Sequence, residues 1–158
     1  MKQRRIQLAA AVALVAIVSV VATTALAGDG RNAKADLDGY QELSPASSVS
    51  TLGNGKFKAK VRSNEIQYTL SYEDLEGGAV LFAHIHFGAR ATNGGVSAFL
   101  CGGGTKGACP ASGTVTGTIV PTDVVGPANQ GIAAGEFDEL VRAMRAGATD
   151  ANVHTTQF

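Results

Sequence analysis

The chain is poor in the residues that build most catalytic and metal sites. It has only three histidines and two cysteines among 158 residues. No Gly-x-Ser-x-Gly motif sets a serine nucleophile on a strand-to-helix turn. The glycine-rich segment CGGGTKGAC (101–109) lacks the Gly-x4-Gly-Lys-Ser/Thr spacing of a phosphate-binding loop. The sequence therefore offers no catalytic residue, and this absence weighs against an enzyme without excluding one.

The first 27 residues have the composition of an export signal. Lys2, Arg4 and Arg5 precede an uncharged run (6–27) that ends in Ala-Leu-Ala. A basic start, an apolar centre and a small-x-small end predict a signal peptide cleaved after Ala27. An uncleaved membrane anchor is the alternative, because about 20 apolar residues span a bilayer. We expect an exported protein that is secreted, periplasmic or in the cell envelope, and that meets the membrane only before cleavage.

The exported chain lacks an excess of basic residues. Cleavage removes three of the 13 basic residues and no acidic residue, which leaves a net charge of −3. This balance argues against nucleic acid as a partner. Lys56, Lys58 and Lys60 alternate with smaller or apolar residues, so we interpret them as the solvent face of a strand and not as a phosphate-binding patch.

The two cysteines, Cys101 and Cys109, are eight positions apart. An oxidising compartment favours a disulfide between them, and the glycines allow the chain to turn back. Metal or redox chemistry is less favoured, because the spacing matches neither a CxxC motif nor a zinc knuckle.

Alternating and β-branched segments dominate the rest of the chain. Residues 28–34 are polar and predicted to be flexible. The expected strands span 35–43, 56–62, 65–75, 79–87, 96–101, 113–120 and 151–156. The segment 79–87 is apolar on both faces, as in a covered central strand. About seven short strands predict an antiparallel Greek-key β-sandwich or barrel, one domain over 35–158.

One helix is predicted over 134–147. Phe137, Leu140, Val141 and Met144 recur at helical spacing, with acids early, arginines late and Gly147 after them. This order suits the helix dipole and a glycine C-cap.

Four segments together resemble the CHRD domain family: DLDGYQEL (36–43), HIHFGARATNGGV (84–96), SGTVTGTIV (112–120) and AGEFDELVRAMRAGATDANVHTTQF (134–158). The resemblance implies an all-β extracellular domain found singly in secreted bacterial proteins, and it implies no reaction. Members usually have an aromatic residue just before VNVHT, where this chain has Asp150 and Ala151. They also continue into a GGEIRGQ-like strand, whereas this chain stops at Phe158, so we expect one strand partner to be missing. Either the chain is truncated, which we favour, or another strand or subunit fills the gap.

The histidines offer the main candidate site. His84 and His86 share one face of a strand, because residues i and i+2 point the same way. Asn152 and His154 form a second same-face pair. If the two strands are neighbours, three imidazoles could hold copper or zinc. Alternatively, the histidines make hydrogen bonds that fix strand register. Asn152 and Thr155 are expected to be supporting hydrogen-bond residues, and Glu42 is a candidate carboxylate partner.

Two functions remain open from the sequence. The first is a non-catalytic extracellular binding or structural module that acts on an envelope or extracellular protein or on itself. The second is a mononuclear metal-binding protein that uses His84, His86 and His154. The His-x-His spacing is locally similar to that of copper/zinc superoxide dismutases. A dinuclear dismutase site needs about twice as many histidines, which excludes that activity.

Overall fold

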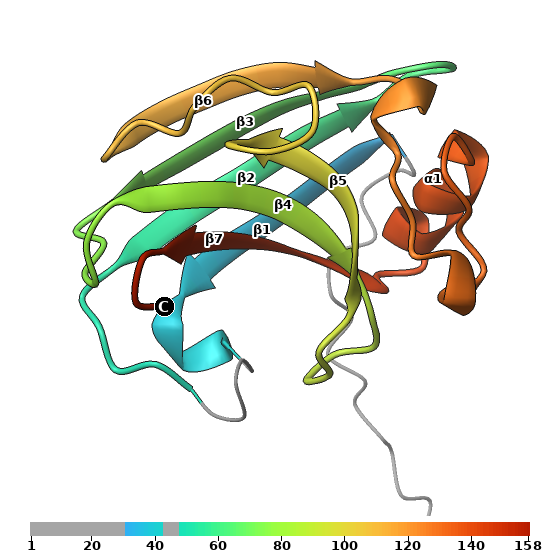
Figure 1. Ribbon diagram of the computed structural model, residues 1–158. Coiled ribbons are helices and arrows are strands. Elements are labelled where there is room, and N and C mark those ends of the chain that lie inside the picture. Colours follow the sequence, from blue (N-terminus) through green and yellow to red (C-terminus); the bar gives the residue numbers. More distant parts are fainter. Residues whose placement is uncertain (1–30, 43–47) are drawn as a thin grey trace, which may run out of the picture.

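The computed structural model describes residues 31–42 and 48–158 and shows two packed antiparallel sheets (Figure 1). The four-stranded sheet has the order β1-β2-β3-β6, and the three-stranded sheet has the order β5-β4-β7. Their strands are β1 (Asn32–Asp38), β2 (Asn54–Val61), β3 (Ile66–Glu73), β4 (Val80–Phe87), β5 (Gly95–Cys101), β6 (Gly113–Ile119) and β7 (Thr149–Thr155). The predicted seven-stranded β-sandwich is confirmed, and the described strands do not close into a barrel.

The alternation of β2 and β3 builds the core. Phe57 and Ala59 of β2 are buried. The lysines that alternate with them, Lys56, Lys58 and Lys60, are exposed. Tyr68 and Tyr72 of β3 are buried on the same inner face. The Tyr68 hydroxyl donates a 2.6 Å hydrogen bond to the carbonyl of Leu100 in β5, which ties one sheet to the other.

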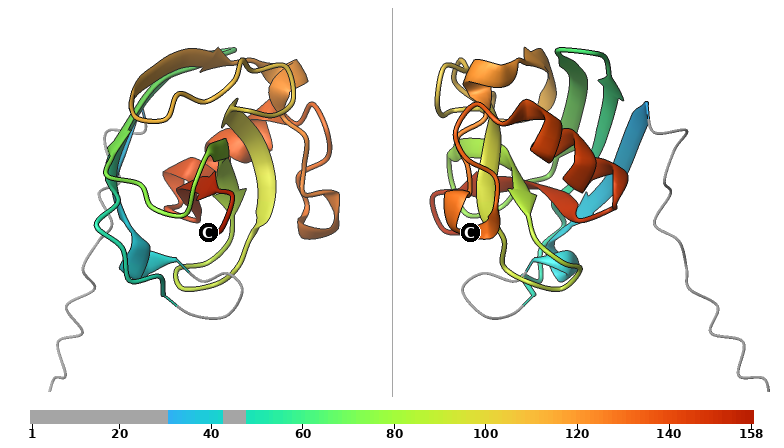
Figure 2. Two further views of the ribbon diagram at one scale, coloured as in Figure 1. Left: turned by 60° about the vertical axis from the view of Figure 1, so that its left-hand side comes forward. Right: turned by 90° about the vertical axis from the view of Figure 1, so that its right-hand side faces the viewer.

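The helix α1 (Phe137–Arg145) lies at one end of the two sheets (Figures 1 and 2). Its apolar face is buried, with Leu140 fully inaccessible to solvent. Gly147 adopts φ +67° just after the helix, as its predicted capping role requires. The helix is shorter than the predicted span, which included the glycine-containing turn before it. Short 3-10 helices span Gly39–Gln41, Pro121–Asp123 and Ala128–Gln130.

The beginning of the domain differs from the sequence prediction. Residues 32–34, which the sequence predicts to be flexible, belong to β1 and pair with β2. The first strand ends at Asp38 because the Asp38 carboxylate accepts a hydrogen bond from the Gln41 amide and caps a 3-10 helix. The predicted signal peptide (1–27) and residues 28–30 lie outside the described residues. No helix in the described part of the chain is long and apolar enough to cross a bilayer.

Candidate functional site

The pairing of β4 with β7 decides where the histidines lie. Phe82 is opposite His154, His84 is opposite Asn152, and His86 is opposite Asp150. Ala83 and Ile85, which alternate with the histidines, belong to the core. Because successive strand residues point to opposite faces, the histidines lie on the outer face of the three-stranded sheet.

We call His84, His86 and His154 the histidine cluster. The ring centroids of His84 and His86 are 4.4 Å apart, and those of His84 and His154 are 5.0 Å apart. Phe82 and Phe99 flank His84 at 5.4 Å and 5.8 Å. His84 is only 3% exposed because these four rings surround it. The structure thus unites the three histidines that the sequence placed on two distant segments.

The surroundings of His84 and His154 favour neutral imidazoles. Burial, followed by the nearby His86 and His154, lowers the pKa of His84 from 6.5 to about 4. Burial also lowers the pKa of His154, with Glu42 opposing the shift. A neutral imidazole keeps a lone pair for a metal ion or a hydrogen-bond donor. Within residues 31–42 and 48–158, the buried Nδ1 of His84 has no hydrogen-bond partner.

Two carboxylates border the cluster. Asp150 Oδ2 lies 3.5 Å from Nδ1 of His86, and the Asp150 side chain is half exposed. Glu42, which follows the first 3-10 helix, accepts a 2.6 Å hydrogen bond from Nδ2 of Asn152. Glu42 and Asn152 therefore meet beside the cluster, a contact that the sequence did not predict. Asp150 was missed, although its position two residues before Asn152 places it on the same face.

Thr155 does not join this group. It lies on the inner face of β7 and is buried. Its Oγ1 accepts a 3.2 Å hydrogen bond from the amide of Phe158, so it holds the end of the described chain instead of a histidine.

The rings of His86 and His154 both pack against the ring of His84. No group of three or more histidine, cysteine, aspartate or glutamate side chains in residues 31–42 and 48–158 is arranged to hold a metal ion. His84 and His86 are tilted by only 37° and pack ring against ring. Joint coordination of one ion would require these side chains to turn.

The family model for the CHRD domain matches residues 33–158. The chain belongs to the CHRD domain family. The match extends from the first strand to the end of the chain and includes every residue of the histidine cluster. Searches of curated proteins and of solved structures gave no match. Family membership indicates an extracellular-type binding module.

The cysteines of this CHRD domain form the predicted disulfide, Cys101–Cys109. Within the loop they enclose, Lys106 Nζ donates 2.7 Å hydrogen bonds to Asp123 Oδ2 and to the carbonyl of Thr118. Asp123 also accepts from the hydroxyl of Thr105 and the amide of Val120. These hydrogen bonds hold the disulfide loop against the 3-10 helix after β6, which indicates a structural role for the disulfide. The sequence carries no local signal for the Lys106–Asp123 pair, which joins the disulfide loop to the 3-10 helix after β6.

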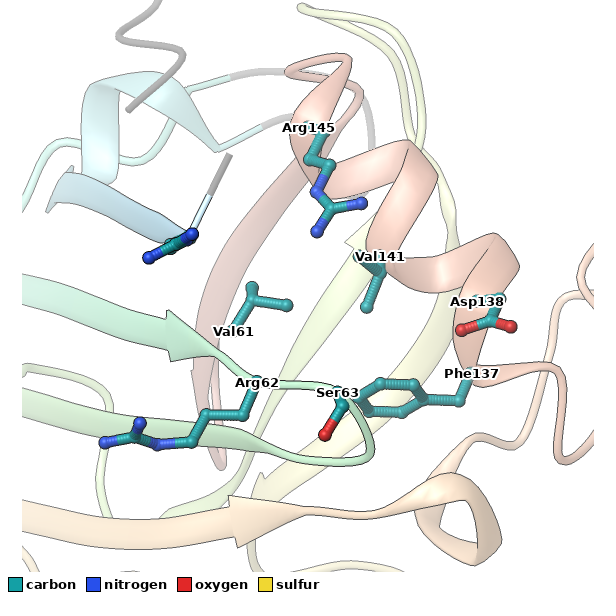
Figure 3. Close-up of a pocket in the computed structure, with 8 residues that line it drawn as sticks. Val61, Arg62, Ser63, Phe137, Asp138, Val141 and Arg145 are labelled. Atoms are coloured by element: carbon teal, nitrogen blue, oxygen red, sulfur yellow. The ribbon is translucent and has the colours of Figure 1, made fainter. Parts of the chain in front are cut away.

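A cleft of about 250 Å³ lies between α1 and the β2–β3 turn of the CHRD domain. Figure 3 shows Phe137 and Val141 of the helix pointing toward Val61 and Ser63. Arg31, Arg62 and Arg145 line the cleft, together with Asp138. Arg31 and Arg145 already interact with other groups of the protein. We therefore assign no ligand to this cleft.

Proposed function

We propose that the protein is an exported, non-catalytic binding module. The observation that carries the proposal is the CHRD match, which spans nearly all of the chain after the predicted leader. The Cys101–Cys109 disulfide supports it, because such bonds persist in oxidising compartments. The partner is an envelope or extracellular component or a second copy of the chain.

Exposed apolar side chains offer contact points for a protein partner. Tyr40, Leu81 and Val125 are large apolar residues with 65%, 45% and 46% exposure. Aromatic and aliphatic side chains at the surface commonly anchor protein interfaces.

The proposal is tested by photo-crosslinking in the native host. A photoreactive amino acid replaces Tyr40, Leu81 or Val125 in the full-length chain, and the exposed Glu73 on the four-stranded sheet serves as a control. We expect a discrete adduct outside the cytoplasm from at least one apolar position. Absence of adducts from all three positions, with the chain folded and exported, would contradict binding to a protein or to itself.

A second candidate function is binding of one copper or zinc ion by His84, His86 and His154. It is favoured by the three neighbouring imidazoles and by Nδ1 of His84, which has no hydrogen-bond partner in the part of the chain that the structure describes. His86 and His154 would turn their rings toward a common ion. The bordering carboxylates would then orient the ligands, as outer-shell groups commonly do.

Elemental analysis of protein purified from its native compartment tests the second candidate. We expect about one copper or zinc ion per wild-type chain and a clear loss in the His86→Ala variant. Phe99→Leu, which changes a flanking ring without removing a ligand, is the matched control. Equal metal content in the wild type and His86→Ala would eliminate the metal function.

A further inference from the structure

The outer face of the four-stranded sheet is a polar surface unlike the outer face of the other sheet. Its strands present charged, hydroxyl and amide side chains, and no apolar side chain stands among them. These outward residues are Asn32, Lys34, Asp36 and Asp38 of β1, Asn54, Lys56, Lys58 and Lys60 of β2, Gln67, Thr69, Ser71 and Glu73 of β3, and Thr114, Thr116 and Thr118 of β6.

The strand register gathers positive charge at one part of this surface. Lys34 of β1 lies directly opposite Lys58 of β2, and Lys60 is the next outward residue along β2. Like charges directly opposite each other destabilise a sheet. Lys56 of the same strand forms an ion pair, because its Nζ is 2.7 Å from Asp36 Oδ1. The hydrogen bond that the Asp36 carboxylate accepts from Lys56 lowers the pKa of Asp36, and the charge of Lys58 also lowers it.

Hydroxyl and amide groups continue the lysine rows across the sheet. Lys58 is opposite Thr69, which is opposite Thr116 on β6. Lys60 is opposite Gln67. We call Lys34, Lys58, Lys60, Gln67, Thr69 and Thr116 the lysine face. Neighbouring strands lie about 4.8 Å apart, and outward residues on one strand recur about every 7 Å, so the charges of the face are spread along and across the sheet.

This chemistry fits an extended, hydroxyl-rich polyanion. Lysine ammonium groups on flexible stems bind anions as point charges without requiring one fixed geometry. Threonine hydroxyls donate and accept hydrogen bonds, and the Gln67 amide, whose Nε2 donates a 2.8 Å hydrogen bond to Glu65 Oε1, has an oxygen that can accept from sugar hydroxyls. The face has no aromatic ring on which a nucleic-acid base could stack and no apolar side chain that could enter a bilayer.

We propose that the lysine face binds an acidic polysaccharide, with its anionic groups on Lys34, Lys58 and Lys60 and its hydroxyls on Thr69, Thr116 and Gln67. The proposal rests on the proposed function, because it names the extracellular partner of an exported binding module. It also explains why the sheet tolerates two opposed lysines.

The test measures binding of the disulfide-bonded chain, beginning at residue 28, to polygalacturonate by calorimetry at low and high salt. We expect Lys34→Gln/Lys58→Gln to bind about tenfold more weakly, a loss of about 1.4 kcal/mol. Arg90→Gln/Arg142→Gln removes the same charge from exposed residues elsewhere and should bind as the wild type does. Salt should weaken the wild type more than the lysine variant.

Thr69→Val/Thr116→Val separates a polysaccharide from a general polyanion. This variant keeps every charge, and we expect it to bind polygalacturonate more weakly. Unchanged binding of either face variant would overturn the proposal, as would equal or tighter binding to single-stranded DNA or to anionic phospholipid vesicles. Circular dichroism verifies that each variant is folded. If the folded chain is exported but does not bind polygalacturonate, only the polysaccharide proposal is contradicted. If the chain is retained in the cytoplasm, the proposed function is contradicted.

Discussion

The rings of His84 and His154 lie 5.0 Å apart at an angle of 66°, and the antiparallel pairing of β4 with β7 brings them together. His84 lies within the central strand of its sheet, and His154 lies near the end of the chain. Their proximity makes protonation of one ring unfavourable for the other. The cluster is therefore sensitive to acid whether or not it binds a metal.

Acid should destabilise the fold between pH 6.5 and 4. The pKa of His84 falls from 6.5 to about 4 on folding, so the unfolded chain takes up a proton first as the pH is lowered. The contribution of His84 is constant above about pH 6.5 and is lost progressively down to about pH 4, by about 3 kcal/mol at most. Urea unfolding at a series of pH values measures this loss.

The matched variant is His84→Leu, which removes the buried titrating group and keeps an apolar side chain in its place. Its free energy of unfolding should vary less over the same interval. If the two pH profiles are parallel, His84 is not the source of the acid sensitivity.

Removal of the disulfide should lower stability without changing the fold. The bond closes a loop with a sequence separation of 8. Such a short loop corresponds to about 2–3 kcal/mol of unfolded-state entropy. Cys101→Ser/Cys109→Ser should show this decrease in urea unfolding, and the wild type in reducing agent should match it. An unchanged free energy of unfolding would mean that the loop is held by its other contacts.

Loss of Asp123 should be among the more damaging changes near the surface. Its side chain is 7% exposed and that of Lys106 is 15% exposed, so Asp123→Ala leaves a largely buried ammonium group without its carboxylate. We expect a loss of about 3 kcal/mol in the free energy of unfolding. Thr105→Val removes only one neutral donor to Asp123 and should cost about 1 kcal/mol. Equal effects of the two variants in thermal unfolding would show that the ion pair is not the important contact.

The contact between Asn152 and Glu42 should depend on the amide. Asn152→Asp keeps the size of the side chain but places a second carboxylate where the 2.6 Å hydrogen bond to Glu42 now lies. We expect faster hydrogen exchange around residues 39–42 in this variant, because like charges repel. Glu42→Gln in the same background should restore protection. Unaltered exchange in Asn152→Asp would show that this contact does not hold the segment.

The sequence predicted best what depends on local alternation. The period of two in 56–62 and 65–75 predicted β2 and β3, and the spacing of His84 and His86 predicted their shared face. The same rule places Thr155 on the face opposite His154, so its hydrogen bond holds the end of the described chain and not a histidine. Local patterns could not show that Glu42 meets Asn152, because that contact joins a segment after β1 to the last strand.

The lysine face could not be predicted from the sequence alone. Residues 28–34 looked too polar for a strand, and Lys34 was therefore not connected with Lys58. Their opposition arises from the register of β1 against β2, which a single sequence does not reveal. Similarly, the approach of His154 to His84 depends on which strand becomes the neighbour of β4.

Intact-mass analysis of the native chain recovered from outside the cytoplasm tests the central claim, an exported and oxidised binding module, most directly. The account predicts a chain that begins at Gly28 and weighs two hydrogens less than its reduced form, because Cys101 and Cys109 are joined. A full-length chain with two free thiols, found only in the cytoplasm, would contradict it.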